Sequence, residues 1–454
     1  MKKLKISNIL ITINILFLIG CVIFYGSRMY KYYRLENPKP EDIKTLYDKV
    51  SSGKNIVKKG DGLYKEGNNY YYKGKNVNNY LRYSGRLWRI VSLDENGSIK
   101  LITDDLQTSL VWSIDADYDT SYLRSWLNDK DIEIKSFYSS LDNTEILMDT
   151  KTCYDEVNDK NVTCEKFVTD KIGTLSIYEY EKSGSSEGYL NIGSYWWTSN
   201  NNSDNKAWYV YSKGTINNEV SSGSNFYSYG VRPTITINGK ISNFNGEGTK
   251  ENPYEIVFDR GNKLSEKYVG EYFKFNNITF KILEKSNDYV KLVSSDLLKE
   301  NNDYVLKSFG SSNYFSQDEG IGYYLNNVFY KTLEKRDDIL LGTFNVGRYD
   351  KSYKYDFNKI AEYKLNAYVG LLQLGELFIN DCDNYLLMSR TITSDKTVYQ
   401  VLENGKIYVG NLTSEKHVRP VIYVKPDIEI KKGSGSANDP WVGEEWKRRK
   451  SLEN

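Results

Sequence analysis

The feature that most constrains the fold of this 454-residue chain is an internal duplication. Segment 230–237 (GVRPTITI) matches 417–424 (HVRPVIYV), and segment 248–254 matches 435–441, where each copy has Pro followed by an aromatic residue. Four of the chain's seven prolines occupy these two paired positions. Abundant residues align by chance, but the rarest turn-forming residue does not easily do so twice. The chain is therefore expected to fold as two related units.

Weaker matches precede these segments in the same order. The matched pairs are 87–91 with 279–283, 99–102 with 290–293, 105–106 with 296–297, 126–128 with 324–326, 173–179 with 370–376, and 195–199 with 385–389. The predicted organisation has five parts, namely 1–27 (cytoplasmic tip and transmembrane signal anchor), 28–57 (juxtamembrane linker), 58–258 (repeat 1), 259–443 (repeat 2) and 444–454 (basic tail).

The N-terminus predicts attachment to a membrane. An apolar run from Ile9 to Tyr25 follows three lysines and is long enough, at about 1.5 Å per residue, to cross the hydrocarbon core as a helix. A first helix before a large polar domain usually leaves its basic N-terminus in the cytoplasm. We expect a single-pass plasma-membrane protein with most of its chain extracellular. The alternative is a lipoprotein, because segment 18–21 (LIGC) fits a lipobox that would attach lipid to Cys21.

The pattern within each copy predicts an α+β fold with mainly antiparallel sheets. Short runs rich in Val, Ile, Tyr and Trp alternate with Asn-Gly, Ser-Gly and Asn-Asn turns, which is typical of strands and hairpins. Segment 94–98 (DENGS) predicts one such turn, because Asn-Gly tolerates a positive φ. Around 121–128 and 322–333 the apolar spacing becomes helical, which indicates at least one helix in each copy.

Composition argues against several classes of function. The formal net charge is only +1, so no overall field favours nucleic acid. One histidine and four cysteines leave little material for a histidine-based catalytic triad, a zinc cluster or an iron–sulfur site, and we expect no metal, cofactor or catalytic residue.

Cys153 and Cys164 share a polar segment, and an extracellular location favours a disulfide between them, although two unpaired thiols are the alternative. Cys382 then has no partner and is expected to be a buried small apolar residue.

Several segments of repeat 1 resemble bacterial C-type-lectin-like domains, the group that includes formylglycine-generating-enzyme-like and uncharacterised surface domains. The similar segments are YWWTS at 195–199, AWYVY at 207–211, GTI at 214–216, YGVRP at 229–233 and YLRSWLN at 122–128. Repeat 2 shares the resemblance through the duplication. The resemblance implies a loop-bearing scaffold that binds a glycan, a peptide or a partner protein. Formylglycine-generating members need a reactive cysteine pair near the end of the domain, and no cysteine lies between Cys164 and Cys382.

Two polar segments of repeat 1 are the candidate recognition surface, because Tyr together with Ser, Gly and Asn is typical of binding loops. The candidate ligand-binding residues are Asn200, Asn201, Asn202, Asn205, Trp208, Tyr227 and Tyr229. The paired motifs Arg232-Pro233 and Arg419-Pro420 are assigned a structural role, since an Arg at a strand entrance more often satisfies internal carbonyl groups than a ligand.

These observations favour a membrane-anchored extracellular binding protein with duplicated lectin-like domains and no catalysis. One alternative is an envelope structural or assembly factor that works through contacts with other proteins. A second alternative is a carboxylate-based hydrolase, whose signature would be two carboxylates converging in one cleft.

Overall fold

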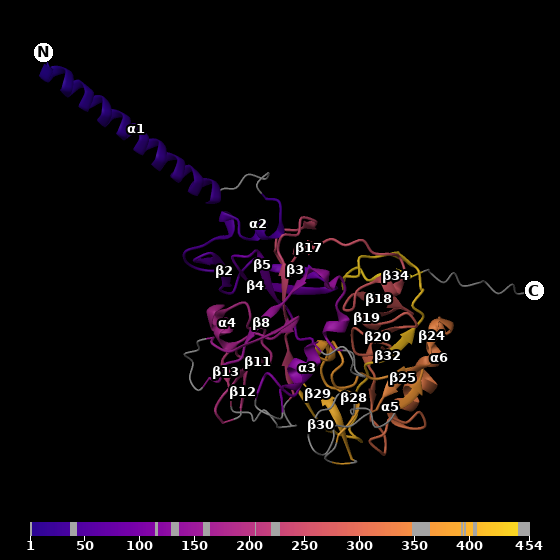
Figure 1. Ribbon diagram of the computed structural model, residues 1–454. Helices are drawn as coiled ribbons and strands as arrows, with labels where there is room; N and C mark the ends of the chain where they lie inside the picture. Colours follow the sequence, from indigo (N-terminus) through magenta and orange to yellow (C-terminus); the bar gives the residue numbers. More distant parts are fainter. Residues whose placement is uncertain are drawn as a thin grey trace, which may run out of the picture.

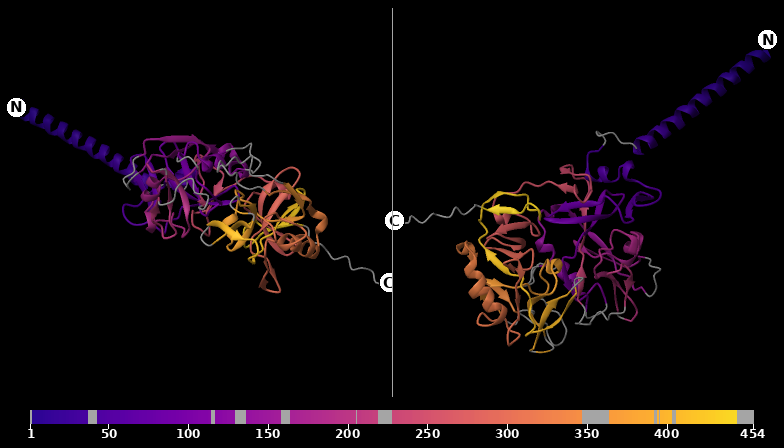
Figure 2. Two further views of the ribbon diagram at one scale, coloured as in Figure 1. Left: turned by 90° about the horizontal axis from the view of Figure 1, so that it is seen from below. Right: turned by 180° about the vertical axis from the view of Figure 1, so that it is seen from behind.

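The computed structural model describes residues 2–36, 43–113, 117–128, 136–157, 164–204, 206–218, 228–346, 364–391, 394, 396–402 and 406–443. A long N-terminal helix, α1 (Lys2–Glu36), projects from a body made of two parts that lie side by side (Figures 1 and 2). We refer to residues 43–258 as the first half and to residues 259–443 as the second half. The predicted basic tail, 444–454, lies outside the described residues.

Helix α1 is long and apolar enough to span a membrane or to act as a signal sequence. Its apolar stretch, Thr12–Lys31, has a mean hydropathy of 1.6, and none of it is buried against the body. Cys21 lies within this continuous helix. The predicted N-terminal apolar helix is thus confirmed, while its orientation and the choice between an anchor and a lipoprotein stay predictions.

Each half contains one large curved sheet of mixed strand direction. In the first half, the strands are β1 (Gly62–Glu66), β2 (Asn69–Lys73), β3 (Tyr80–Tyr83), β4 (Arg86–Leu93), β5 (Ser98–Thr103), β7 (Leu147–Met148), β10 (Ile172–Gly173), β15 (Thr234–Asn238), β16 (Phe244–Asn245) and β17 (Tyr254–Ile256). In the second half, they are β18 (Tyr272–Phe275), β19 (Ile278–Lys285), β20 (Val290–Ser294), β24 (Ile339–Leu340), β27 (Val369–Gly370), β32 (Val421–Val424), β33 (Ile430–Lys432) and β34 (Trp441–Gly443).

Each half also contains a five-stranded sheet. In the first half, its strands are β6 (Thr108–Leu110), β11 (Trp196–Asn201), β12 (Ala207–Val210), β13 (Ile216–Asn217) and β14 (Tyr229–Val231). In the second half, they are β23 (Leu306–Lys307), β28 (Tyr385–Arg390), β29 (Thr397–Val401), β30 (Ile407–Asn411) and β31 (Lys416–His417). The other strands in the described part of the chain form three two-stranded ribbons, namely β8 (Thr150–Cys153) with β9 (Phe167–Asp170), β21 (Lys299–Glu300) with β22 (Asp303–Tyr304), and β25 (Gly342–Asn345) with β26 (Lys364–Ala367).

The strand order is the same in the two halves. The five-stranded sheets run β13-β12-β11-β14-β6 and β30-β29-β28-β31-β23. The large sheets share the central order β15-β5-β4-β3-β17 and β32-β20-β19-β18-β34. Even the register shift recurs, between Ile90 and Ser92 in the first half and between Ile282 and Glu284 in the second. This agreement supports the duplication inferred from the sequence, although the boundaries 58–258 and 259–443 stay predictions.

One predicted pairing between the copies needs correction by a single residue. The sequence comparison set Tyr195 against Tyr385, whereas Trp196 lies opposite Gly230 and Tyr385 lies opposite His417 in equivalent parallel strand pairs. Trp196 is therefore the counterpart of Tyr385. The shared Tyr misled the comparison, because hydrogen bonding to the neighbouring strands, and not side-chain identity, fixes the register.

Most strand pairs are antiparallel, as predicted, but each half also has two parallel pairs. These are β11 with β14, β3 with β17, β28 with β31, and β18 with β34. Among the described residues, strand residues outnumber helical residues, and the helical residues include the whole of α1. The body is therefore mostly β, with fewer helices than an α+β class implies.

Short helices cover the sheets and connect the strands. The α- and π-helical segments are α2 (Leu46–Val50), α3 (Tyr122–Asn128), α4 (Ile177–Lys182), α5 (Gly320–Tyr323), η7 (Tyr324–Phe329) and α6 (Tyr330–Thr332). The 3-10 turns are η2 (Gly53–Asn55), η3 (Tyr138–Ser140), η4 (Thr144–Ile146), η5 (Ser185–Glu187), η6 (Leu264–Glu266), η8 (Arg336–Asp338) and η10 (Ile379–Asp381). Helix α3 and the helical run from α5 to α6 occupy the two places where the sequence predicts helices.

Part of the predicted linker belongs to the folded body. Thr45 and Asp48 form a capping box at the start of α2, and Leu46 and Val50 are fully buried. The hydroxyl of Tyr47 donates a hydrogen bond of 2.7 Å to the carbonyl oxygen of Asp94, at the predicted 94–98 turn. The linker prediction for 28–57 is therefore wrong over this stretch, because two apolar side chains of α2 complete the core of the first half.

Candidate binding cleft between the two halves

The two halves share one core and are joined by specific hydrogen bonds. A single cluster of buried apolar side chains includes Trp126 of the first half and Leu374 of the second. The Nε1 of Trp126 donates a 2.8 Å hydrogen bond to the carbonyl oxygen of Gly375, and the Thr108 hydroxyl donates one of 2.7 Å to the carbonyl oxygen of Glu376. Their relative placement is thus fixed by buried contacts.

A cleft of about 530 Å³ opens where the two halves meet. Both halves contribute to its walls, which are mainly polar. The lining residues are Asp105, Leu106, Ile192 and Ser194 from the first half, and Tyr272, Thr279, Lys281, Ser295, Asp296, Asn380, Asp381 and Ala437 from the second. A polar cavity of this size between two packed units is a natural place for a ligand.

Asp105 and Asp296 occupy equivalent positions in the two copies, and both line this cleft. Asp105 follows β5 by two residues, and Asp296 follows β20 by two residues. The duplicated fold therefore presents one carboxylate from each half to the same space. The sequence comparison paired these two aspartates but did not nominate them, because it gave no sign that the equivalent ends of the two copies face each other.

The paired arginine motifs hold the loops that carry these aspartates. Arg232 is fully buried, and its Nε and Nη2 donate hydrogen bonds of 3.0 and 2.9 Å to the carbonyl oxygen of Thr103. Arg419 is also fully buried, and its Nε donates one of 3.1 Å to the carbonyl oxygen of Ser294. Thr103 and Ser294 are the last residues of β5 and β20. These contacts are of the internal kind expected from the sequence for Arg232-Pro233 and Arg419-Pro420.

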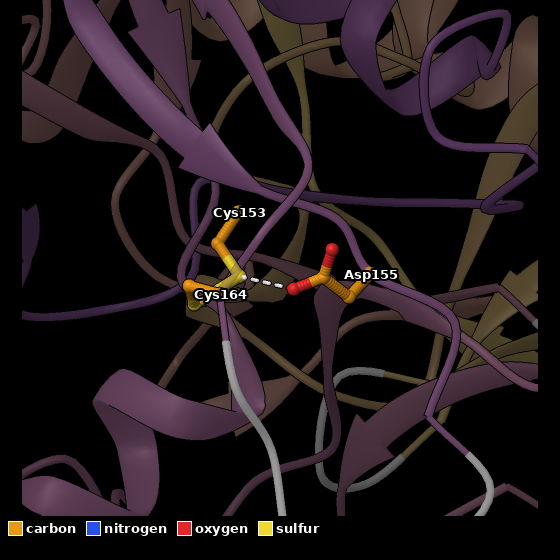
Figure 3. A group of neighbouring side chains, drawn as sticks. All are labelled: Cys153, Asp155 and Cys164. Atoms are coloured by element: carbon orange, nitrogen blue, oxygen red, sulfur yellow. Dashed lines mark hydrogen bonds between the residues drawn. A yellow bond between two sulfur atoms is a disulfide. The ribbon is translucent and has the colours of Figure 1, made fainter.

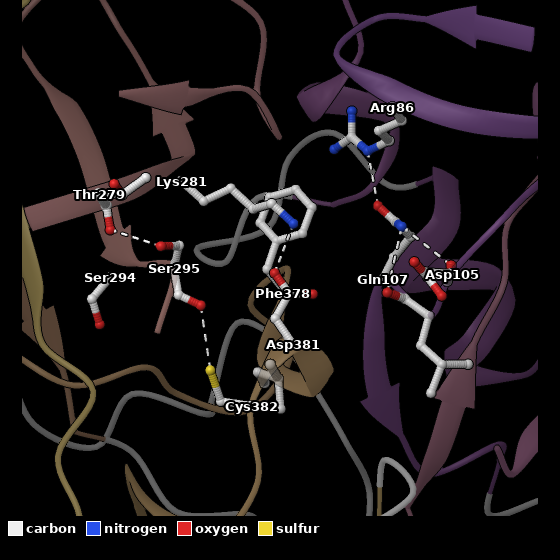
Figure 4. A network of polar contacts seen from close by, with 12 residues as sticks. Arg86, Asp105, Gln107, Thr279, Lys281, Ser294, Ser295, Phe378, Asp381 and Cys382 are labelled. Carbon is white, nitrogen blue, oxygen red and sulfur yellow. Dashed lines mark hydrogen bonds and ion pairs between the residues drawn. The ribbon is translucent and has the colours of Figure 1, made fainter. Parts of the chain in front are cut away.

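An ion pair crosses the second-half wall of the cleft. The Nζ of Lys281 lies 2.7 Å from a carboxylate oxygen of Asp381. Figure 4 shows this pair in the space between Asp105, on the first half, and Ser295, on the second. Burial alone would lower the pKa of Lys281, but Asp381 and Tyr272 together outweigh burial and hold the pKa above its ordinary value. The ammonium group is thus kept charged and anchored.

The carboxyl group of Asp105 has a raised pKa. Its residue remains in contact with solvent in the cleft, yet the surrounding protein desolvates the carboxyl group and, together with the nearby Asp104, raises the pKa of Asp105. Asp381 adds to this effect, whereas Arg232 and Lys281 oppose it. The carboxyl group of Asp105 accordingly holds its proton to a higher pH than an ordinary aspartate.

Asn380 lines the cleft, and Cys382 lies behind its wall, in contact with the lining residue Ser295. Asn380 accepts a 3.1 Å hydrogen bond from the Ser109 hydroxyl through Oδ1, while its Nδ2 is buried without a hydrogen-bond partner among the described residues. Cys382 is half-buried, and its thiol lies 3.4 Å from the carbonyl oxygen of Ser295 (Figure 4). Burial raises the pKa of the Cys382 thiol, which makes it a poor nucleophile.

The predicted recognition segment is mostly buried. Asn200 is fully buried, accepts a hydrogen bond from the backbone N–H of Ile177 and donates one to the carbonyl oxygen of Asp155. Asn202 is buried and accepts hydrogen bonds from the backbone N–H groups of Asp204 and Lys206. These asparagines shape turns, so their predicted place on an exposed surface is wrong.

Trp208 and Asn201 are likewise involved in internal contacts. Trp208 is buried and donates a 2.8 Å hydrogen bond from Nε1 to the carbonyl oxygen of Val157. Asn201 is half-buried and pairs with Ala207 across the hairpin. Two other candidates, Asn205 and Tyr227, lie outside the described residues.

Tyr229 is buried in an aromatic cluster and not exposed on a loop. Its ring lies 4.7 Å from that of Trp197, 4.6 Å from that of Tyr209 and 5.2 Å from that of Tyr195. Lys406 of the second half places its Nζ 4.0 Å from the centre of the Tyr195 ring. The cluster therefore packs within the first half and is contacted by Lys406 of the second half, which the local polar sequence around Tyr229 did not reveal.

The structure joins Cys153 and Cys164 in a disulfide (Figure 3), with their Cα atoms 5.6 Å apart. Asp155 lies close to both sulfur atoms, a grouping that would suit a metal ion if the thiols were free. The disulfide occupies both sulfurs, and Asp155 accepts hydrogen bonds from the backbone N–H groups of Glu165 and Lys166. This group of residues therefore has a structural role, and its sulfur and carboxylate atoms are already engaged.

Comparisons with protein-family models, with curated proteins and with solved structures found no significant match.

Proposed function

We propose that this chain is a membrane-anchored binding protein of a bacterial cell surface that takes its ligand in the cleft between the two halves. The observation that carries the proposal is the convergence of Asp105 and Asp296, from equivalent positions in the two copies, on one cavity. Duplication followed by packing of the copies face to face builds such a site from one loop used twice.

The walls of the cleft favour a glycan as the ligand. Carboxylates accept hydrogen bonds from adjacent sugar hydroxyls, and both halves supply one to the cleft. Tyr272 supplies an aromatic surface that suits the apolar face of a sugar ring. A volume of about 530 Å³ is within the usual range of ligand sites. A peptide with several hydroxyl or amine groups would use the same acceptors and is the second ligand to test.

The proposed location outside the cytoplasm rests on α1 and on the disulfide. Helix α1 can span a membrane, and a disulfide between Cys153 and Cys164 is typical of an oxidising compartment. The resemblance of repeat 1 to C-type-lectin-like domains supports the same assignment. Protease treatment of intact cells should remove both halves, and the reverse result, with cleavage only after permeabilisation, would place the body inside the cell.

Binding is tested with the full chain in detergent against a panel of cell-wall and host glycans. Asp296→Asn removes a charged acceptor and should weaken glycan binding about tenfold or more. Asp288→Asn, at an exposed turn outside the cleft, is the matched control and should leave the affinity unchanged. Equal binding by both variants would place the ligand elsewhere, and binding of partner proteins alone would favour an assembly factor.

A carboxylate-based hydrolase is a second candidate, and the raised pKa of Asp105 favours it. A carboxyl group that keeps its proton is suited to act as a general acid beside an ionised second carboxylate. Incubation of the purified protein with any glycan it binds, followed by mass spectrometry, separates the two functions. Cleavage that is lost in Asp105→Asn would establish the hydrolase, whereas recovery of intact glycan supports binding alone.

A further inference from the structure

A second cavity, of about 120 Å³, lies between the halves. The first half contributes Ser136, Ser139 and Ser140, and the second half contributes the remaining walls. A salt bridge of 2.8 Å between Lys285 and Asp142 links the halves at this cavity. None of its lining residues is shared with the larger cleft, so the two sites are distinct.

The cavity contains a buried ion pair between Lys291 and Glu376. The Lys291 side chain is 3% exposed and the Glu376 side chain is 7% exposed. Glu376 also accepts a 3.0 Å hydrogen bond from the backbone N–H of Gln373 through its second oxygen. Burial alone would lower the pKa of Lys291, but Glu376, with Tyr423 and Glu284, outweighs burial and raises the pKa above its ordinary value, so the lysine stays charged.

Two polar atoms in these walls lack any hydrogen-bond partner among the described residues. They are the hydroxyl of Ser136, a residue with no solvent exposure, and the Oε1 of Gln373, a residue that is 5% exposed. A buried polar atom without a partner costs free energy, and such atoms in a cavity usually meet a bound molecule or ordered water. One atom comes from a lining residue of each half.

The first half has an equivalent ion pair, but it lacks the unpartnered acceptor that Gln373 provides in the second half. Lys100 and Glu179 are the counterparts of Lys291 and Glu376, and their side chains are more exposed, at 13% and 19%. The counterpart of Gln373 is Ser176, whose hydroxyl is fully engaged in the capping box of α4. The unpartnered acceptor is therefore a property of the second half alone, and the fold does not require it.

We propose that this cavity binds a small zwitterion, an α-amino acid with five to seven non-hydrogen atoms. A cavity of about 150 Å³ accommodates benzene, so about six heavy atoms is the appropriate size. Lys285 and Lys291 are already paired with the carboxylates of Asp142 and Glu376, so neither lysine is free to hold an anion, and a ligand with both charges is favoured over one with a net charge. The ammonium group donates to Gln373 Oε1, and the carboxylate accepts from the Ser136 hydroxyl.

The test is calorimetric titration of the full chain in detergent with glycine and with each enantiomer of alanine and serine. Acetate and ethylamine, which carry one charge each, are the matched probes. At least one amino acid should bind about tenfold or more tightly than either probe, since both unpartnered atoms are satisfied only by the zwitterion. Absence of binding by all the amino acids, or equal binding by acetate or ethylamine, would overturn the proposal and leave a cavity filled with water.

Two variants locate the binding in this cavity. Gln373→Leu and Ser136→Ala should each weaken amino-acid binding about tenfold or more, while Ser194→Ala, in the larger cleft, should not change it. Without ligand, Ser136→Ala should melt at the same or a higher temperature, because the lost hydroxyl has no partner. A lower melting temperature for Ser136→Ala without ligand, or unchanged binding by both variants, would contradict the assignment. Glycan binding in the larger cleft is independent of these outcomes.

Discussion

The Nε1 of Trp126 donates a 2.8 Å hydrogen bond to the carbonyl oxygen of Gly375, which joins helix α3 of the first half to the second half. The Trp126 side chain is fully buried, and Gly375 has a φ of +83°. A positive φ is readily adopted by glycine, which lets this carbonyl turn toward the indole. The two copies are therefore connected by a buried polar contact as well as by apolar packing.

Trp126→Phe tests whether this contact couples the halves. The substitution keeps most of the ring but removes the donor, which should lower the free energy of unfolding by about 1–3 kcal/mol. Trp112→Phe is the matched control, because Trp112 donates a 2.7 Å bond to the carbonyl oxygen of Thr198 within the first half. In a calorimetric scan, Trp126→Phe should broaden or split the transition, whereas Trp112→Phe should only shift it. The same shape for both variants would show that this bond does not couple the halves.

The duplicated framework was predictable from the sequence because it depends on local signals. The Val-Arg-Pro motifs mark equivalent strand entrances, and their arginines make equivalent internal hydrogen bonds at Thr103 and Ser294. Helix α3 follows from apolar spacing, and the turn at 94–98 forms where Asn-Gly predicts it, with Gly97 at a φ of +91°. The helix and the turn are set by neighbours along the chain, whereas the arginine contacts join residues more than 100 positions apart and were recognised only because the motif recurs.

The candidate site was not predictable, because it depends on how the copies pack. Asp105 and Asp296 are unremarkable in sequence and become a pair only when the two halves meet. The sequence around Tyr229 carries a signal, but the signal is misleading. Its Ser-, Asn- and Tyr-rich neighbourhood is typical of an exposed loop, yet aromatic rings from β11 and β12 bury it, with Lys406 nearby. No local pattern reports contacts between residues so far apart.

Removal of the disulfide is expected to destabilise the first half. Cys153 and Cys164 are separated by 11 residues, and closing such a loop stabilises the folded state by about 3 kcal/mol in the chain-entropy model. The double variant Cys153→Ser with Cys164→Ser should therefore melt at a lower temperature. Thiol labelling of denatured protein should modify these cysteines only after reduction, while Cys382 is labelled without it. Labelling of all three before reduction would contradict the disulfide.

Asp105 should make the protein's stability depend on pH in a particular direction. Its pKa in the folded protein is raised, so the folded state holds the proton more tightly than the unfolded chain, whose value is near 3.8. This contribution is fully present below that pH and is lost as the pH rises through the folded-state value. Asp105→Asn stays neutral, so its stability relative to the wild type should increase between about pH 4 and pH 7. Thermal melts across that range measure the difference, and a constant or decreasing difference would refute the raised pKa.

The duplicated ion pairs provide a matched comparison of burial. Lys291→Met leaves Glu376 as an unpaired, nearly inaccessible charge, which should cost about 3–5 kcal/mol. Lys100→Met makes the same change at the equivalent position, where Glu179 is more exposed to water and still caps α4, so the expected cost is about 1 kcal/mol. Denaturant unfolding of the two variants gives both values under one set of conditions. Equal losses would mean that the lower exposure of Lys291 and Glu376 does not raise the cost of leaving the carboxylate unpaired.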